Sequence, residues 1–465
     1  MKSSIQFLGG VGTVTGSQHL LKINGSEILL DCGLFEGKRD EAYQRNLHFD
    51  FNPPFLKHAV LSHAHIDHSG NIPNLVRQGF HGTIYATHAT KDLAAYMLPD
   101  SGHIQEEDVK FVNNINKKKG LPPRRPLYTK EDAFVSLEYI KGMPYFEYFE
   151  LTDGVRVSFC EAGHVLGAAL TIFEWGANSS RRRLAYAVDL GRPNLPLLRD
   201  PMIPQDLDYL ILESTYGGRF HEEISLAKEK IGTIVKQTIE NGGKVIIPSF
   251  ALERTQAVVY ILMQLLEEGI IDKIPIFVDS PLAADITEVF RAHPECFDNA
   301  TKQIIREDQD PFGIGRVRYI RATEASKSLN ERTDPMIIIS ASGMCEGGRI
   351  LHHLKNHIHK ENTTILIVGF MAQHTLGRSL VERKPSVKIF GEKYRVKARI
   401  EIINSLSAHA DQNELLDFVR GADRHLKGIF LVHGEPEQSA ALAERLKEER
   451  YPVYVPRQGD IVALE

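Results

Sequence analysis

His63-Ala-His65-Ile-Asp67-His68 is the most informative segment of the chain. It places three imidazoles and one carboxylate within six positions, shortly after the apolar segment 59–61, which is predicted to be a strand. Imidazole nitrogen and carboxylate oxygen are ligands that zinc accepts. A loop can sort these side chains into two groups, His63 with His65 and Asp67 with His68, which suits two neighbouring metal ions. The alternative is a solvated polar loop, and so dense a set of ligand-type residues argues against it.

Each group needs further ligands from distant parts of the chain. His164 follows a predicted strand, and Asp189 and His433 each end one. Side chains at strand ends converge on one rim of a sheet, where sites are usually built. A single histidine after a strand is usually structural, so only the complete set indicates a metal site.

Composition narrows the class of protein. The chain has 465 residues, of which 42% are hydrophobic and 25% charged, as in an ordinary globular protein with room for more than one core. No apolar run approaches the ~20 residues of a membrane span, and the N-terminus has no signal-peptide pattern. We therefore expect a cytoplasmic protein, or a nuclear one if the source has a nucleus, without a membrane partner.

Charge and cysteine usage limit how the protein binds. The formal net charge is −5, whereas a protein that binds nucleic acid by bulk charge alone would be basic. Any contact with nucleic acid must therefore be local. The four cysteines are scattered and form no C-x-x-C pair, which indicates free thiols in a reducing compartment.

The order of predicted strands and helices along the chain indicates one domain interrupted by another. Residues 1–217 consist of short strands with turn signals, and residues 398–465 return to that style. Residues 218–397 alternate strands with helices, which predicts a mainly parallel sheet with right-handed crossovers. We assign the strand at 398–404 to the last part, and we expect Lys117–Arg125 to be an exposed basic loop.

A family resemblance follows from the order of the motifs. H-x-H-x-D-H with spaced His, Asp and His resembles the metallo-β-lactamase superfamily. Glu213-Ser-Thr-Tyr-Gly, Ser407-Ala-His409-Ala-Asp411 and His433-Gly-Glu435 resemble the further motifs of its β-CASP nucleases. These include the pre-mRNA 3′-end cleavage endonuclease subunit and its bacterial and archaeal relatives. The resemblance implies an α/β fold, in which an αββα metallo-β-lactamase sandwich is interrupted by an inserted β-CASP domain with a mainly parallel sheet flanked by helices.

The resemblance also implies two Zn²⁺ ions per chain. Seven residues would be ligands: His63, His65 and His164 for one zinc, Asp67, His68 and His433 for the second, and Asp189 as the bridge. Asp31 would orient the ligand loop through a hydrogen bond, although a turn residue after a strand explains it equally well.

The chemistry implied is phosphodiester hydrolysis. Two zinc ions about 3.5–4 Å apart activate a shared hydroxide and clamp the phosphate oxygens, with Asp67 and Asp189 at the centre. His409 would protonate the leaving oxygen, held by Glu213, whose charge keeps the imidazole cationic. Glu213 could instead be a surface carboxylate, but the Ser-Thr-Tyr that follows it favours the functional interpretation.

Four predicted strand-to-helix junctions in residues 218–397 carry small and basic residues. Anions bind where parallel strands lead into helix N-termini, and arginine adds a fork of donors. We expect this edge to face the metal site and to hold RNA phosphates. The predicted contacts are Ser249, Arg254, Ser340, Ser342, Gly343, Arg349, Thr375 and Arg378. Ordinary helix caps and tight turns are the alternative for some of them.

Two other patterns are interpreted as structural. The glycine-rich segment 9–16 has a threonine at position 15 and no helix after it, so we interpret it as a loop near the site and not as a dinucleotide loop. His352, His353, His357 and His359 could supply a metal site, but we interpret them as a solvated helix face.

Together these observations predict a metal-dependent hydrolase, a zinc-dependent ribonuclease that acts on single-stranded RNA. His433 favours RNA, because DNA-repair relatives tend to carry valine there. The 465 residues lack the additional domains of exonuclease-type bacterial relatives and of archaeal relatives, which favours endonucleolytic cleavage. A 5′-exoribonuclease, a DNA nuclease, a hydrolase of small thioesters or lactams and an inactive scaffold subunit remain alternatives. A homo-oligomer is compatible with this prediction.

Overall fold

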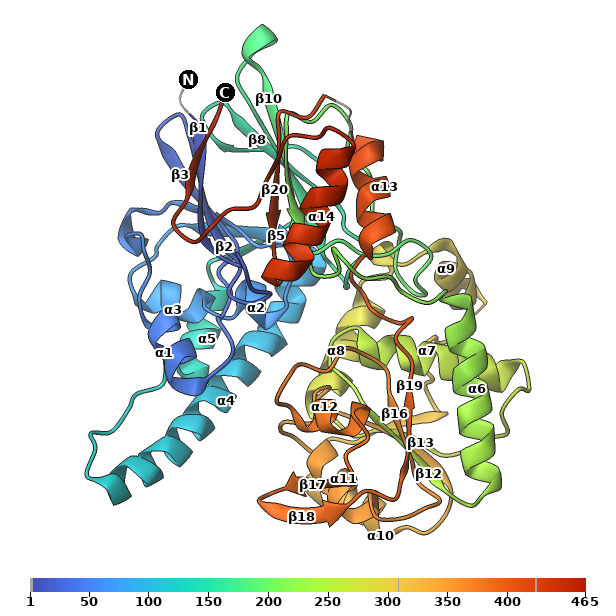
Figure 1. Cartoon of the computed structure of the whole chain (residues 1–465). Coiled ribbons are helices and arrows are strands. Elements are labelled where there is room, and N and C mark those ends of the chain that lie inside the picture. Colours follow the sequence, from blue (N-terminus) through green and yellow to red (C-terminus); the bar gives the residue numbers. More distant parts are fainter. Residues whose placement is uncertain (1–2, 308, 423–424) are drawn as a thin grey trace. The chain divides into compact units, whose positions relative to one another are not determined.

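The computed structural model describes residues 3–307, 309–422 and 425–465. The chain divides into two compact units (Figure 1). Unit 1 consists of Met1–Pro193, Asp200–Phe220 and Ala408–Glu465, and unit 2 consists of Asn194–Arg199 and His221–Ser407. One unit is therefore inserted into the other, and the short segment Asn194–Arg199 joins the inserted unit through a bridge between Leu198 and Phe297.

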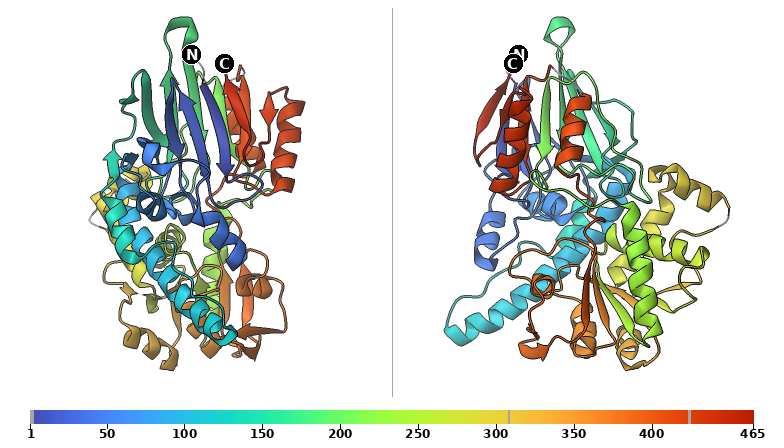
Figure 2. Two further views of the ribbon diagram at one scale, coloured as in Figure 1. Left: turned by 90° about the vertical axis from the view of Figure 1, so that its left-hand side faces the viewer. Right: turned by 45° about the vertical axis from the view of Figure 1, so that its right-hand side comes forward.

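Unit 1 contains two seven-stranded sheets. The first has the order β22 (Ile461–Leu464), β1 (Ser3–Gly9), β2 (Gln18–Ile23), β3 (Ser26–Leu30), β4 (His58–Val60), β5 (Thr83–Thr87) and β6 (Ile140–Met143). The second has the order β21 (Val453–Tyr454), β20 (Gly428–Val432), β11 (Tyr209–Glu213), β10 (Arg182–Ala187), β9 (Ala169–Trp175), β8 (Val155–Glu161) and β7 (Phe149–Thr152). The last strand β22 runs antiparallel beside β1, so the end of the chain completes the first sheet (Figure 2).

The two sheets pack face to face around an apolar core. Phe7 and Val60 of the first sheet lie in one buried cluster with Phe173, Tyr186 and Phe430 of the second. Among its described residues, unit 1 has the helices α1 (Arg39–Leu47), α2 (Ile66–Ser69), α3 (Ile72–Arg77), α4 (His88–Lys119), α5 (Lys130–Leu137), α13 (Gln412–Ala422) and α14 (Pro436–Glu448). Helices α3, α4 and α5 cover the other face of the first sheet, and α14 packs on β20 and β21 with α13 beside it (Figure 1). These four layers are the predicted αββα sandwich.

Unit 2 is built on a six-stranded sheet. Its order is β14 (Val317–Tyr319), β13 (Ile276–Val278), β15 (Met336–Ser340), β12 (Lys244–Pro248), β16 (Thr364–Ile367) and β19 (Arg399–Ile402). Every pairing is parallel. The central strands β12 and β15 are buried along their whole length, as expected where helices cover both faces of a parallel sheet. The predicted fold class is therefore confirmed.

The remaining elements of unit 2 connect or flank these strands. They are α6 (Ser225–Glu240), α7 (Arg254–Glu267), α8 (Pro281–Ala292), α9 (Asn299–Arg306), α10 (Thr323–Glu331), α11 (Ile350–His357), α12 (Leu376–Val381) and the hairpin of β17 (Ser386–Ile389) with β18 (Glu392–Arg395). The predicted strand at 398–404 appears as β19, which pairs with β16 and so belongs to the sheet of unit 2. Its alternating pattern suits either sheet, because the pattern encodes burial and not the pairing partner.

One helix differs from the prediction for residues 117–125. Helix α4 continues through Pro99 and ends at Gly120, whose backbone is in the left-handed conformation. Lys117–Lys119 form its last turn and are not part of a loop. Three positive charges are favourable there, because the carbonyl end of a helix carries negative partial charge. In the part of the chain that the structure describes, no helix has the length and apolar character of a membrane span.

Candidate metal centre

All seven predicted metal ligands lie in unit 1, next to strand ends. His63 and His65 follow β4, and the short helix α2 carries Asp67 and His68. The other three are His164 after β8, Asp189 after β10 and His433 after β20. Because β8, β10, β11 and β20 run in the same direction, their carboxyl ends share one edge of the second sheet. The direction of the strands thus gathers side chains that are far apart in the sequence.

The first group of donor atoms lies around His65. Its Nδ1 is 3.0 Å from His63 Nε2 and 3.3 Å from His164 Nε2. Asp189 Oδ2 is 3.4 Å from His63 Nε2 and 3.1 Å from His164 Nε2. These four side chains each offer a ligand atom within 4.8 Å of the others.

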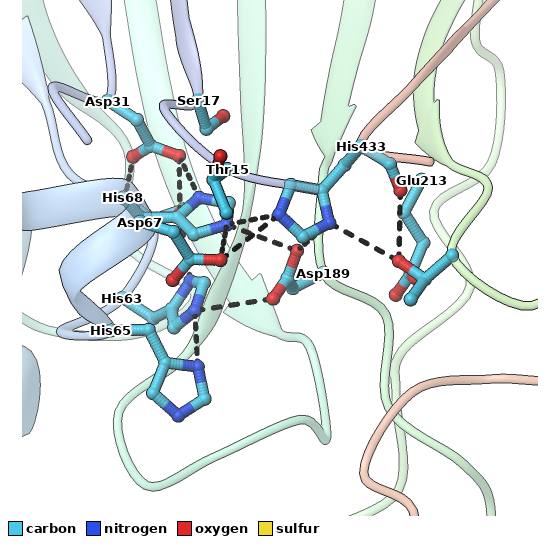
Figure 3. Close-up of polar contacts among 12 residues, drawn as sticks. Thr15, Ser17, Asp31, His63, His65, Asp67, His68, Asp189, Glu213 and His433 are labelled. Atoms are coloured by element: carbon cyan, nitrogen blue, oxygen red, sulfur yellow. Dashed lines mark hydrogen bonds and ion pairs between the residues drawn. The ribbon is translucent and has the colours of Figure 1, made fainter. Parts of the chain in front are cut away.

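The second group lies on the other side of Asp189 (Figure 3). His68 Nε2 is 3.1 Å from His433 Nε2, and Asp67 Oδ2 is 3.3 Å from His433 Nε2. The second oxygen of Asp189, Oδ1, is 3.3 Å from His68 Nε2 and 3.2 Å from His433 Nδ1. Asp189 therefore presents one oxygen to each group of histidines.

These donor sets fit metal ions. Imidazole nitrogens face one another at 3.0–3.3 Å, and a tetrahedral zinc with bonds of ~2.0–2.1 Å would hold its ligand atoms roughly 3.3–3.4 Å apart. Asp189 Oδ1 is buried and accepts no hydrogen bond from the described residues. A cation would satisfy this oxygen and the converging lone pairs together.

The protonation states of His65 and Asp189 suit metal binding. Burial and the neighbouring imidazoles lower the pKa of His65 to about 3, so its ring is neutral. Burial would raise the pKa of Asp189, but the surrounding histidines outweigh it and hold that pKa well below its usual range. Neutral imidazole and ionised carboxylate are the forms that coordinate metals.

Asp31 holds one ligand ring in place. Its Oδ2 lies 2.7 Å from His68 Nδ1 and accepts hydrogen bonds from Ser62 Oγ at 2.8 Å and Tyr186 Oη at 3.0 Å. Ser62 N donates to Oδ1 at 2.7 Å. A neutral His68 ring with its Nδ1–H directed at Asp31 would carry its lone pair on Nε2, which faces His433. These contacts favour the orienting role for Asp31 over that of a simple turn residue.

Several neighbours of the ligands were not identified from the sequence. A Cβ on Gly33 would lie 1.6 Å from the backbone oxygen of Asp67, so only glycine allows this chain to pass behind α2. Thr215 Oγ1 lies 3.3 Å from His433 Nδ1. The glycine-rich loop reaches the centre, as expected, since His433 N donates to Gly10 O at 2.6 Å. The sequence offers one signal for each of the two missed residues. Gly33 lies beside Asp31, and Thr215 lies within the Glu213 motif.

His409 and Glu213 form a pair at the edge of the first group. His409 Nδ1 lies 3.0 Å from Glu213 Oε2, and Glu213 is fully buried. The His409 ring centroid lies 4.5 Å from that of His164. Burial alone would lower the pKa of His409, but Glu213 and Asp189 outweigh it and raise it to about 9. The pair thus offers a cationic imidazole beside the donor groups.

The predicted phosphate contacts lie in unit 2, at strand-to-helix junctions. Most of their hydroxyls bond within the junctions: Ser249 Oγ accepts from Thr255 Oγ1 at 3.1 Å, and Ser340 Oγ donates to a backbone oxygen at 2.9 Å. Ser342 Oγ accepts from two backbone N–H groups, and Thr375 Oγ1 caps α12. These groups stabilise the junctions, which is the alternative that the sequence left open.

The arginines at these junctions also have protein partners. Arg349 Nη1 lies 2.7 Å from Asp279 Oδ1, and Arg378 Nε lies 2.8 Å from Glu382 Oε1. Arg254 begins α7, and Gly343 lies against the ring of Phe250. The phosphate role of these eight residues stays a prediction.

The interpretation of the histidine cluster on α11 is wrong for two of its members. His353 and His357 are fully buried. His353 Nε2 lies 2.7 Å from Asp279 Oδ2, and its Nδ1 lies 2.9 Å from Asn330 Oδ1. Residues four positions apart share one face of a helix, and this face of α11 is turned toward the core of unit 2.

Three family models match the chain. A metallo-β-lactamase superfamily model matches residues 11–139, a β-CASP domain model matches residues 255–380, and a model described as a Zn-dependent metallo-hydrolase RNA specificity domain matches residues 393–456. The matches cover parts of both units.

Similar curated proteins extend over nearly the whole chain. Ribonuclease TTHA0252 of Thermus thermophilus is 34% identical and covers 97% of this chain and 98% of its own. An RNase J-like protein of Methanocaldococcus jannaschii is 30% identical over 99% of both chains. Transcription termination factor FttA of the same organism is 27% identical over 99% of this chain and 72% of its own. A crystal structure of a protein of unknown function from Enterococcus faecalis V583 has a TM-score of 0.54 at 13% identity, over 100% of both chains, and so shares the fold.

Replacing Asp31 by alanine should weaken zinc binding by roughly 10- to 100-fold, because His68 loses the acceptor that orients its ring. Competition with a chromogenic chelator measures the affinity. Asp50→Ala removes an exposed carboxylate and should leave the affinity unchanged. An Asp31→Ala protein that binds zinc as tightly as the wild type would reduce Asp31 to a turn residue.

Alanine at Gly33 should lower the free energy of unfolding by about 1–3 kcal/mol or more, because its methyl group overlaps the backbone of Asp67. Thermal unfolding and zinc content should fall together. Gly347→Ala places a methyl group in open space and serves as the control. Unchanged melting of Gly33→Ala would show that the loop can move away from α2 at no cost.

Proposed function

Because the chain belongs to the β-CASP ribonucleases of the metallo-β-lactamase superfamily, we propose that it is a two-zinc endoribonuclease that cleaves single-stranded RNA at the centre described above. The chain is a metal-dependent hydrolase, and its substrate is RNA. The observation that supports the proposal most directly is the convergence of two histidine groups on the two oxygens of Asp189.

Two ions are proposed because the donors form two sets. His63, His65 and His164 would hold one zinc, and a second set of Asp67, His68 and His433 would hold the other. When bound, zinc supplies Lewis acidity for the phosphate oxygens and lowers the pKa of a coordinated water. The ionised Asp189 lowers the repulsion between two cations by lying between their sets of ligands.

His409 is proposed as the general acid. Glu213 accepts a hydrogen bond from its Nδ1, which keeps the imidazolium form and leaves the Nε2 proton for transfer. That proton would move to the ribose oxygen that leaves phosphorus, so no alkoxide has to be released. Glu213 itself would position His409, since its carboxylate is fully buried beside Leu190 N, which donates to it at 2.5 Å.

Endonucleolytic cleavage is proposed from the motifs. His409 and His433 stand in the motifs by which the chain resembles the pre-mRNA 3′-end cleavage endonuclease subunit. The inactive-scaffold alternative is disfavoured, because every expected donor is present and oriented toward the others. A small thioester or lactam as substrate is disfavoured by the RNA-specificity match over residues 393–456.

A reducing compartment, the cytoplasm, is proposed as the place of action. All four cysteines are buried, and none of them is joined by a disulfide bond to another described residue. Burial raises the pKa of Cys160 to about 11, which keeps that thiol protonated and unreactive.

His409→Ala should lower the single-turnover rate of RNA cleavage by about 10²- to 10⁴-fold while both zinc ions stay bound, because general-acid catalysis contributes about this much. Cleavage of labelled RNA and elemental analysis are measured on the same preparation. His359→Ala, which removes an exposed histidine, should have wild-type activity. Loss of zinc from His409→Ala would make His409 a ligand and remove its proposed role.

Covalently closed, unstructured circular RNA should be cut as readily as a linear RNA of the same sequence, because an endonuclease needs no free end. Removal of zinc with a chelator should abolish both reactions, and added zinc should restore them. If the circle resists while the linear RNA is degraded to mononucleotides from its 5′ end, the enzyme is an exonuclease.

A further inference from the structure

Three strand-to-helix junctions of unit 2 leave the same edge of its sheet. Strand β12 pairs in parallel with β15 on one side and with β16 on the other. The segments that follow these strands therefore lie side by side at their carboxyl ends. They are residues 249–253 after β12, 341–349 after β15 and 368–375 after β16.

Hydrogen bonds join the second and third junctions to each other. Gly377 N donates to Met344 O at 3.1 Å, and Leu376 N donates to Glu346 Oε1 at 2.5 Å. The first junction is tied to β15, because Ser249 N donates to Ser340 O at 3.0 Å. The three segments thus form one braced surface and not three independent loops.

Phe250 lies on this surface in a fixed position. Its carbonyl oxygen accepts from Thr255 Oγ1 at 2.7 Å, which ties it to the first turn of α7. Its ring packs on Gly343, where a Cβ would lie 2.7–2.9 Å from three ring carbons. Even so, 42% of Phe250 is exposed. The contact with Gly343 holds the ring and leaves a large part of its surface open to solvent.

The chemistry of this surface suits an unpaired base more than a phosphate. The hydroxyls of Ser249, Ser340 and Ser342 are engaged in the hydrogen bonds that build the junctions. Phe250 is the exposed residue of the first junction, and Phe370, on the neighbouring junction, is also 44% exposed. Stacking on an aromatic ring needs no charge and accepts every base, which fits a chain with a formal net charge of −5.

We propose that Phe250 is a base-stacking residue that holds an unpaired base of the RNA substrate. The inference rests on the proposed ribonuclease function and adds a site that distinguishes single-stranded from double-stranded RNA. A base inside a duplex has both faces covered by its neighbours, whereas an unpaired base can place one face on the Phe250 ring. The residue acts in binding and takes no part in the chemical step.

The test is single-turnover cleavage of a short unstructured RNA at increasing enzyme concentration, which separates half-saturation from the maximal rate. Phe250→Ala should raise the half-saturating concentration about 5- to 100-fold, as expected for one lost stacked base. The maximal rate and the zinc content should stay at wild-type values. Because stacking involves no charge, the dependence of half-saturation on salt should keep its slope.

Two further substitutions separate stacking from packing. Phe250→Trp should keep or improve half-saturation, since it retains an aromatic face. Phe250→Leu keeps an apolar side chain on Gly343 but has no π-face, so it should behave like Phe250→Ala. The matched control is Phe390→Ala, which removes another exposed phenylalanine of unit 2, at the turn between β17 and β18, and should have no effect.

The possible failures are distinguishable. Wild-type half-saturation in Phe250→Ala, or in Phe250→Leu, would overturn the stacking site and leave the ribonuclease function intact. A fall in maximal rate or zinc content with unchanged half-saturation would also overturn it, because the ring would then be structural. If the wild-type protein neither binds nor cuts RNA, the proposed function fails and the stacking site fails with it.

Discussion

The buried carboxylate of Asp189 is the constraint on which the rest of this molecule depends. It is almost inaccessible to water, faces two groups of imidazoles, and has an oxygen that accepts no hydrogen bond from the residues that the structure describes. A buried charge of this kind is costly unless cations or strong donors meet it. The strands β8, β10 and β20 bring His164, Asp189 and His433 to one edge of the second sheet. The fold therefore places a buried negative charge where metal ions can bind and neutralise it.

Contacts with neighbouring residues hold these side chains in their arrangement. Five histidines and two carboxylates so close together would otherwise repel or pair in other ways. Asp31 fixes one ring by occupying its Nδ1, and Gly33 lets the backbone run directly behind the helix that carries Asp67. Loss of a hydrogen bond that orients a metal-ligating side chain typically lowers metal affinity by roughly 10- to 100-fold. The rigid sheet edge and these contacts together preorganise the donors, so little ordering remains to be done when a metal binds.

A structural feature can be predicted from the sequence when the residues that determine it lie close together along the chain. The run 63–68 is local, and its neighbours 31 and 213 stand in short motifs, so the family resemblance that these motifs carry predicted the αββα fold and the residues expected at the centre. Pairing is not local: the strand at 398–404 has the same pattern whichever sheet it joins, and it joins β16. Burial of His353 depends on Asp279, which follows β13. The long α4 continues through Pro99 because the turn before it, with Ala94 and Leu98, packs in the core cluster of the first sheet, which outweighs the local cost of proline.

The strand-to-helix junctions of unit 2 show that the hydrogen-bond partners of a side chain are also hard to predict from the sequence. Serine, threonine and arginine at strand ends are equally good at holding a phosphate and at closing a turn, and a sequence does not say which hydrogen bonds they make. Here most of them close turns or pair with acids. A flexible cation would also lose rotamer freedom on binding, whereas a ring already immobilised on Gly343 loses almost none. An acidic chain that binds a polyanion gains more from such preorganised aromatic surface and from its metal ions than from bulk charge.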